Sequence, residues 1–336
     1  GFTAPAVLAA MALGSYISAV IPFMSTTFIA CFVIVALHIL HMTSVRWGTL
    51  FQDYSTFIKV GLIFFFIALG LTVLKPQDIS ILPLNGDGII MMSPSFAIGL
   101  VWVSYAYTGW NSVIYISGEL IDPKKNISKV MVYATIFVTV LYVLLNYVFL
   151  YSTPIASMVG KVDIAYIAGI EIFGDFGGKI MGLGISILLL STVSSYVYIG
   201  PRIMQIMGED HSFLKILKYK DSKDIPVNAF FVQLSLAILF IATSSFEQVL
   251  MYAGVTLIIT TTLTVISLFV LRYNEPNLVR PYKVLGYPFI PLLFLIANIW
   301  ILYFSFREST QESMVGVSII LVSVLFFLIS KRKKSD

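Results

Sequence analysis

The sequence contains little charge, one cysteine and few histidines, and each shortage excludes a class of protein. Only 11% of the 336 residues are charged, whereas a soluble domain carries about 25%. This deficit excludes a soluble enzyme, a disordered tail and a nucleic-acid binder. The single cysteine, Cys31, excludes a disulfide framework and a cysteine-based zinc site. Because there are also only three histidines, we expect no metal and no cofactor.

The motifs of hydrolytic enzymes and ATP-driven pumps are missing too, since no HExxH, GxSxG or Walker A pattern occurs. We therefore expect no enzymatic activity. Apolar and aromatic residues make up 58% of the chain, and its mean hydropathy is +0.94. Stretches of roughly 20 apolar residues are long enough to cross a bilayer as helices. Ten stretches qualify: 1–21, 26–43, 50–74, 93–118, 129–152, 178–206, 227–244, 247–271, 288–305 and 314–331. The predicted fold class is an all-α polytopic membrane protein.

Lysine and arginine predict the orientation of these spans, because basic loops stay in the cytoplasm. With alternating spans, sixteen of the 21 basic residues fall on the side of the Lys331–Lys334 tail. Only Lys75, Lys161, Lys179 and Arg307 fall on the other side, and Lys59 falls in neither set of loops. We therefore expect a multi-pass protein of the plasma membrane with a cytoplasmic C-terminus. Segment 153–177 is apolar enough to form a short helix on the outer face.

The fourth span carries a polar cluster near its centre, from Ser104 to Ser112. Lipid-facing helices carry Leu, Ile and Val there, whereas this cluster has glycine, tyrosine, threonine and asparagine. Unwound backbone at this depth is tolerated only when it is buried in protein or lines a watery cavity. One interpretation is a broken helix that forms a substrate site at the midplane, as in secondary transporters. The alternative is a stripe of small residues that packs against another helix.

A second anomaly is Lys59, which lies about 15 Å into the third span at 1.5 Å per residue. Such a charge must meet polar groups inside the bundle. It could act as an ion-coupling group or only tether two helices. Hydroxyls at Ser191, Thr192, Ser194 and Ser195 could face it, or could serve ordinary helix–helix hydrogen bonds. His38 and His41 lie on one helical face, and we interpret them as marking the membrane interface rather than a proton path.

Several segments together carry a family resemblance. Residues 107–127 (YTGWNSVIYISGELIDPKKNI) resemble the sixth helix and following loop of amino acid permeases in the amino acid–polyamine–organocation (APC) superfamily. Residues 280–291 (RPYKVLGYPFIP) resemble the loop before that family's eleventh helix. Met207–Asp210 with Ile225–Pro226 is similar to its loop between helices 8 and 9, and Gly1–Ala6 is similar to its third helix.

The resemblance implies a LeuT-like inverted-repeat fold of twelve helices, in which this chain supplies helices 3–12 as one transmembrane transporter domain, 1–336. Helices 1 and 2 would then be missing, in line with a first residue that is glycine and not methionine. It also implies roles for site residues. Tyr105 resembles the aromatic gate, residues 106–109 (Ala106, Tyr107, Thr108 and Gly109) the unwound stretch, and Trp110 and Asn111 the start of the inner half-helix.

Lys59 falls where sodium-independent relatives carry a lysine in place of a sodium ion, next to an eighth helix that here holds Ser191, Ser194 and Ser195. The resemblance thus implies a sodium-independent secondary transporter of amino acids that works by alternating access, with proton symport or amino acid exchange. Neutral substrates are favoured, because no Asp or Glu stands at mid-depth in any span. The partners expected are the amino acid, protons and the lipid bilayer.

Three alternatives remain open at this point. A non-transporting amino acid sensor on the same fold would bind a substrate without moving it. A cationic amino acid or polyamine permease could bind its substrate by cation–π contacts with Trp110 or the tyrosines. A subunit that assembles with a single-span partner is the third. The oligomeric state does not follow from the sequence.

Overall fold

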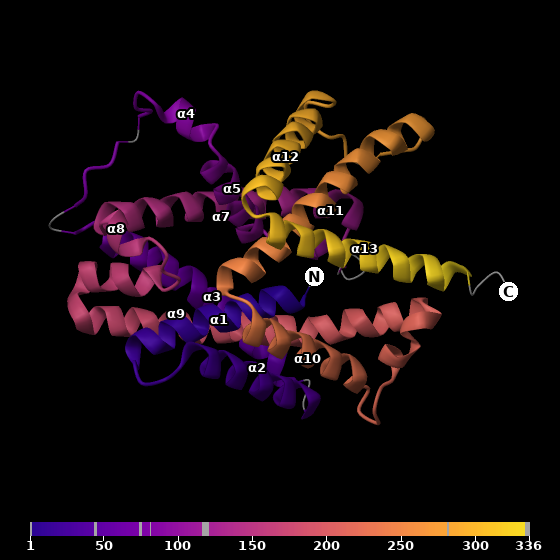
Figure 1. Ribbon diagram of the computed structural model, residues 1–336, viewed down its shortest axis with the longest axis horizontal. Helices are drawn as coiled ribbons and strands as arrows, with labels where there is room; N and C mark the ends of the chain where they lie inside the picture. Colours follow the sequence, from indigo (N-terminus) through magenta and orange to yellow (C-terminus); the bar gives the residue numbers. More distant parts are fainter. Residues whose placement is uncertain are drawn as a thin grey trace. The chain divides into compact units, whose positions relative to one another are not determined.

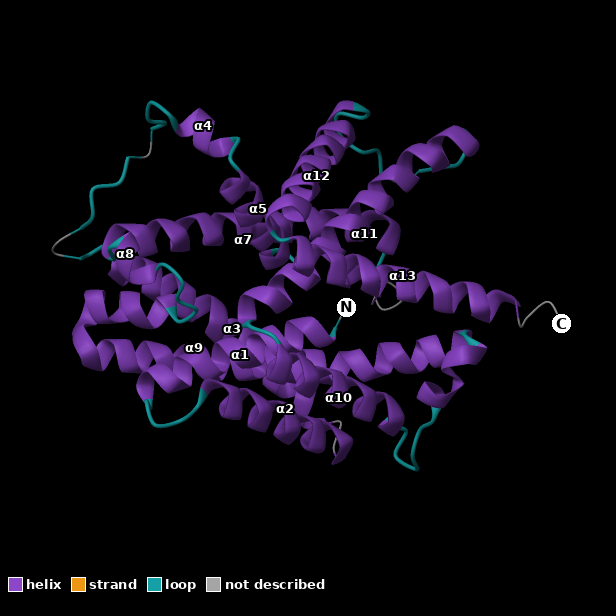
Figure 2. Cartoon of the chain, viewed as in Figure 1, coloured by secondary structure: helices purple, strands orange, loops and turns teal. Residues whose placement is uncertain are grey.

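The computed structural model describes residues 2–43, 46–73, 76–80, 82–115, 121–280 and 282–332, and all regular structure in these ranges is helical (Figures 1 and 2). Residues 116–120 of the predicted fourth span and residues 333–334 of the predicted basic tail lie outside them. The elements are α1 (Thr3–Val20), α2 (Thr26–Thr43), α3 (Arg46–Gly70), α4 (Asp87–Met91), α5 (Pro94–Ala106), α6 (Ser112–Tyr115), α7 (Pro123–Ser152), α8 (Ile155–Met158), α9 (Ile164–Asp210), η2 (Ser212–Lys218), α10 (Val227–Thr243), α11 (Phe246–Asn274), α12 (Phe289–Glu308) and α13 (Thr310–Arg332).

Seven helices of the described chain are long and apolar enough to cross a membrane, and they match seven of the ten predicted spans. The other three predicted spans correspond to shorter apolar helices, Phe57–Gly70 within α3, Pro94–Ala106 and Val227–Thr243. Large apolar side chains are exposed on these helices, for example Phe28 at 62% and Leu263 at 55%. Such a surface requires lipid around it. The prediction of an all-α polytopic membrane protein is confirmed.

The chain forms two compact units, and the first comprises Gly1–Ile79, Val143–Val249 and Val322–Asp336. In this unit α1 packs against α2, α9 and α10. Small residues allow the close approach of α1 and α2: a Cβ added to Gly14 would lie 2.5 Å from the carbonyl oxygen of Thr26. Ala6, Val7 and Ala10 of α1 are completely buried, so α1 lies in the core of this unit.

Helix α9 bends back on itself at Gly174, whose φ of 73° and ψ of −178° are not helical. The two limbs pack side by side. A Cβ on Gly169 would lie 3.2 Å from the Cα of Gly178, and one on Gly182 would lie 3.1 Å from the ring of Tyr166. The first limb is the short helix that we expect within 153–177, so the presence of this helix is confirmed.

The second unit comprises Ser80–Tyr142 and Leu250–Leu321. Here α5 packs against α12, and Val101, Met251, Val255, Ile258 and Ile301 form a buried apolar cluster. One buried polar contact joins α11 to α12, where the Asn298 side-chain amide donates to Thr262 Oγ1 at 3.0 Å. Helix α5 is therefore held on a packed scaffold.

Candidate functional site

The candidate substrate site starts where α5 ends. At the start of α5, Ser93 Oγ accepts a hydrogen bond from the backbone N–H of Phe96 at 3.3 Å, and Pro94 occupies the first turn. Both residue types are favoured at a helix N-terminus. The helix has 13 residues, about 20 Å at 1.5 Å per residue, whereas the hydrocarbon core is roughly 30 Å thick. Helix α5 alone therefore ends before it could cross the bilayer.

Residues 107–111 form a non-helical turn between α5 and α6. Gly109 has a φ of +99°, a conformation that glycine adopts far more readily than other residues. The interruption agrees with the predicted break but is narrower than Ser104–Ser112. Ala106 is helical, contrary to its predicted unwinding, and Trp110 and Asn111 lie in the turn and do not begin the second helix. The polar composition marks the region, but the one glycine with positive φ sets the position of the break.

The chain itself satisfies two carbonyls at the end of α5. The hydroxyl of Tyr142, on α7, donates to the Ala106 carbonyl at 3.0 Å. The Tyr105 carbonyl accepts from the backbone N–H of Thr108 at 2.9 Å and also from the Thr108 hydroxyl. Terminal carbonyls of a helix need such partners away from water. The Tyr105 carbonyl is thus fully engaged by the protein.

Helix α7 contributes residues that the sequence analysis did not identify. The hydroxyl of Tyr107 donates to Thr139 Oγ1 at 3.0 Å, and the rings of Tyr107 and Tyr142 meet edge to face with centroids 5.4 Å apart. Thr135, Thr139 and Tyr142 are spaced four and three residues apart, so they lie on one face of an apolar helix. This spacing of polar residues within an apolar helix is the sequence signal by which they could have been identified. The Trp110 side chain is 46% exposed.

The second candidate site lies between α3 and α9. The ammonium of Lys59 donates to Thr192 Oγ1 at 3.1 Å, and the Thr192 hydroxyl bonds in turn to the Leu188 carbonyl of its own helix at 3.2 Å. Lys59 is half-buried. The expected proximity of this lysine to the hydroxyl cluster is found, and Thr192 is the residue that makes the contact.

The serines of the cluster have other partners. Ser194 Oγ is hydrogen bonded to His41 Nε2 at 2.8 Å, and Ser195 Oγ donates to the backbone carbonyl of Ser191 at 2.8 Å. Ser191 is completely buried. Residues two apart on a helix point about 200° apart, so Thr192 and Ser194 meet different neighbours. The sequence places these hydroxyls on one helix but does not give their separate directions.

The two histidines that we interpret as marking the membrane interface are buried within the protein. His38 and His41 are 0% and 2% exposed, respectively. His38 Nδ1 is hydrogen bonded to the Ile34 carbonyl at 2.8 Å, and its ring meets that of Phe230 edge to face. They are therefore core residues of the first unit. The hydropathy of α2 did not reveal this, because lipid and protein neighbours are both apolar. Across the described ranges, no three His, Cys, Asp or Glu side chains form a metal-binding group.

The sequence is similar to known proteins along nearly its whole length. The profile of the family described as amino acid permease matches residues 2–329. Asc-type amino acid transporter 1 of Mus musculus is 25% identical over 293 residues, which cover 85% of this chain and 54% of that protein. Large neutral amino acids transporter small subunit 2 of Oryctolagus cuniculus is 27% identical over 294 residues, with the same coverage of 85% and 54%.

A third relative, b(0,+)-type amino acid transporter 1 of Rattus norvegicus, is 23% identical over 289 residues, which cover 85% of this chain and 58% of that protein. The chain thus spans about half the length of the curated relatives it matches.

Proposed function

The chain belongs to the amino acid permease family, and on this premise we propose that it is part of a secondary transporter of amino acids. The observation that carries the proposal is the helix interruption at 107–111. There the backbone leaves the regular helical hydrogen-bonding pattern between two apolar helices, and such a break is tolerated in a membrane only where it is buried in protein or lines a cavity. Alternating access around such a site would move the substrate across the plasma membrane.

We place the substrate-binding segment at Tyr105–Asn111. The Tyr105 carbonyl already accepts hydrogen bonds from the Thr108 N–H and the Thr108 hydroxyl, so the Thr108 carbonyl and the Gly109 peptide are the better place for the amine and carboxylate of an amino acid. The exposed Trp110 ring and the Tyr107 ring would contact the side chain of the substrate. Tyr142 and Thr139 would act indirectly, because they hold Ala106 and Tyr107 in position.

Neutral amino acids are the favoured substrates. A cationic side chain would need a counter-charge, and the sequence places no acidic residue at mid-depth of a span. The printed name of one relative, a large neutral amino acids transporter subunit, is in line with this. For Lys59 we propose that the ammonium serves in place of a sodium ion between α3 and α9, so that transport is sodium-independent and proceeds by proton symport or by exchange.

Uptake into proteoliposomes by the full-length protein tests the proposal. We expect accumulation of radiolabelled leucine, alanine or phenylalanine that persists when sodium is replaced by choline. Stimulation by an imposed proton gradient would identify symport, and stimulation only by internal unlabelled amino acid would identify exchange. Transport of lysine or arginine alone would refute the neutral assignment. Binding of leucine without any uptake would refute transport and identify a sensor.

Substitution of Lys59 tests the ion-coupling proposal separately. Lys59→Ala removes the ammonium that binds Thr192, and we expect loss of proton-driven accumulation, or of all uptake in an exchanger. Lys179→Ala is the matched control, because Lys179 is an exposed lysine on α9 itself. If Lys59→Ala kept the accumulation level and its pH dependence of the unsubstituted protein, the proposed role would be wrong.

A further inference from the structure

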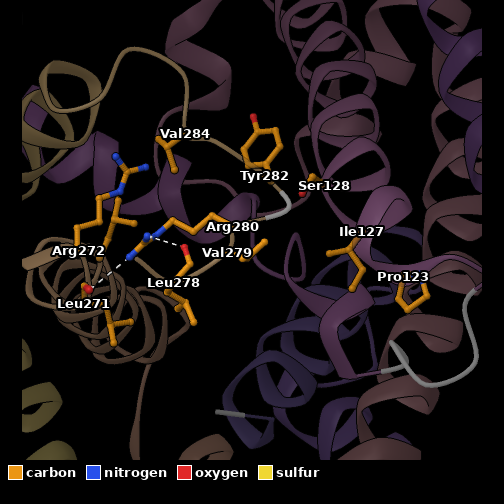
Figure 3. Close-up of a pocket in the computed structure, with 11 residues that line it drawn as sticks. Pro123, Ile127, Ser128, Leu271, Arg272, Leu278, Val279, Arg280, Tyr282 and Val284 are labelled. Atoms are coloured by element: carbon orange, nitrogen blue, oxygen red, sulfur yellow. Dashed lines mark hydrogen bonds between the residues drawn. The ribbon is translucent and has the colours of Figure 1, made fainter. Parts of the chain in front are cut away.

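A cavity in the second unit lies apart from the helix interruption, at the end of α11 and the beginning of α7. Its volume is about 410 Å³. Pro123, Ile127 and Ser128 of α7 line one side, and residues between Leu268 and Val284 line the other (Figure 3). Two arginines, Arg272 and Arg280, belong to its lining.

Arg280 organises the backbone around the cavity. Its guanidinium donates to the carbonyls of Leu278 at 2.8 Å and Glu275 at 2.7 Å, and to those of Pro276 at 3.2 Å and Leu271 at 3.4 Å. Figure 3 shows two of these bonds, to Leu271 and Leu278. Arg280 therefore fixes the loop after α11 in place while its positive charge stays at the cavity.

Arg272 is held differently. Its guanidinium carbon lies 3.7 Å from the centre of the Tyr287 ring, so the ring positions the group without neutralising it. Its Nε atom is buried and has no hydrogen-bond partner among the described residues. Leaving such a donor buried and unpaired costs free energy. Within the described ranges the only ion pairs are Lys220–Asp224 and Arg307–Glu308, so neither arginine of the cavity is paired with a carboxylate there.

The surroundings of the cavity combine positive charge with exposed apolar side chains. Residues 121–129 and 268–284 hold six basic residues, Lys124, Lys125, Lys129, Arg272, Arg280 and Lys283, and only two acidic ones, Asp122 and Glu275. Leu278 is 53% exposed and Val279 is 87% exposed. A site for a soluble anion would not need these apolar chains, whereas a lipid has an anionic headgroup and acyl chains next to each other.

We propose that this cavity binds the phosphate headgroup of an anionic phospholipid. The phosphate lies against Arg272, whose fork of N–H donors suits phosphate oxygens, and the acyl chains cover Leu278 and Val279. The basic loops are those that we expect on the cytoplasmic side, where the leaflet is anionic. The site is separate from the proposed substrate-binding segment, and its occupancy is expected to anchor the loop between α11 and α12 to the membrane surface.

Native mass spectrometry of the full-length protein in detergent tests the proposal without any substitution. We expect one molecule of phosphatidylglycerol to be retained in preference to phosphatidylcholine of the same chain length. Equal retention of the two lipids would overturn the proposal. A soluble probe, glycerol 3-phosphate, distinguishes a site for a lipid headgroup from a site for a free phosphate compound. Displacement of the lipid by an equal concentration of this probe would indicate a free-phosphate site and would also overturn it.

Substitutions then locate the site. Arg272→Gln is expected to weaken phosphatidylglycerol binding about tenfold, the value of one charged hydrogen-bond pair. Arg307→Gln is the matched control, since Arg307 is an exposed arginine near the other end of α12. Ser128→Trp fills the cavity and leaves both arginines intact. We expect this variant to lose phosphatidylglycerol binding to the same extent, so it tests the location even where Arg272→Gln does not fold. Equal loss in Arg307→Gln, or undiminished binding in Ser128→Trp, would refute the location.

Discussion

Gly109→Ala is the substitution that most directly tests the helix interruption. Gly109 has a φ of +99°, and an L-residue held in such a region costs about 1–3 kcal/mol. If transport requires the turn in this conformation, the competent population falls by about 5- to 140-fold, because each 1.4 kcal/mol is a factor of ten. We therefore expect uptake of leucine in proteoliposomes to fall by at least about fivefold.

Gly99→Ala is the control, because it makes the same chemical change in the helix that precedes the turn. Gly99 lies within α5, and a Cβ added there meets no atom within 4 Å. Alanine in a regular helix is better than glycine by up to about 1 kcal/mol, so this variant should be at least as stable and as active as the unsubstituted protein. If Gly109→Ala transported normally, or if Gly99→Ala lost as much activity, the turn would not be the working part of the site.

Two further predictions concern the scaffold. Tyr142→Phe removes the hydrogen bond to the Ala106 carbonyl, which is worth about 1 kcal/mol, so amino acid uptake should fall about fivefold. Tyr147→Phe on the same helix is the control. Equal losses of uptake in the two variants would contradict the role assigned to Tyr142. Gly14→Ala should lower the free energy of unfolding by about 1–3 kcal/mol, seen as a lower Tm, because its Cβ would meet the Thr26 carbonyl oxygen. Gly61→Ala, with open space around it, should not lower the Tm, and a similar loss in both variants would refute the packing argument.

Hydropathy predicted the helices well because a membrane span needs both length and apolar composition, and both can be read from a sequence. The region of the break was also predictable, because Tyr, Thr, Gly and Asn are costly in lipid. Its limits were not, because composition does not specify which peptide adopts a positive φ. Gly109 alone has it in this segment, and the residues on either side of the turn remain helical.

The exact pairings of side chains that are distant in sequence could not be predicted. His41 and Ser194 are 153 residues apart, yet they share a buried hydrogen bond. The contact of Lys59 with Thr192, and not with Ser194, depends on how α3 and α9 are rotated about their axes. Hydropathy carries no such information, because a helix face against lipid and one against protein are equally apolar. For the same reason, hydropathy does not distinguish α7 from an ordinary span and does not single out Tyr142.

The corner at Gly174 also determines how many times the polypeptide is counted as traversing the bilayer. As one straight rod, the 47 residues of α9 would reach about 70 Å, more than twice the hydrocarbon thickness. The limb before the corner, residues 164–173, reaches only about 15 Å and cannot traverse by itself. Counting this limb as a crossing would change the number of crossings by one and would move every later loop to the opposite side of the membrane. The side of the membrane assigned to the basic residues from Lys215 to Lys283 therefore depends on the bend at Gly174.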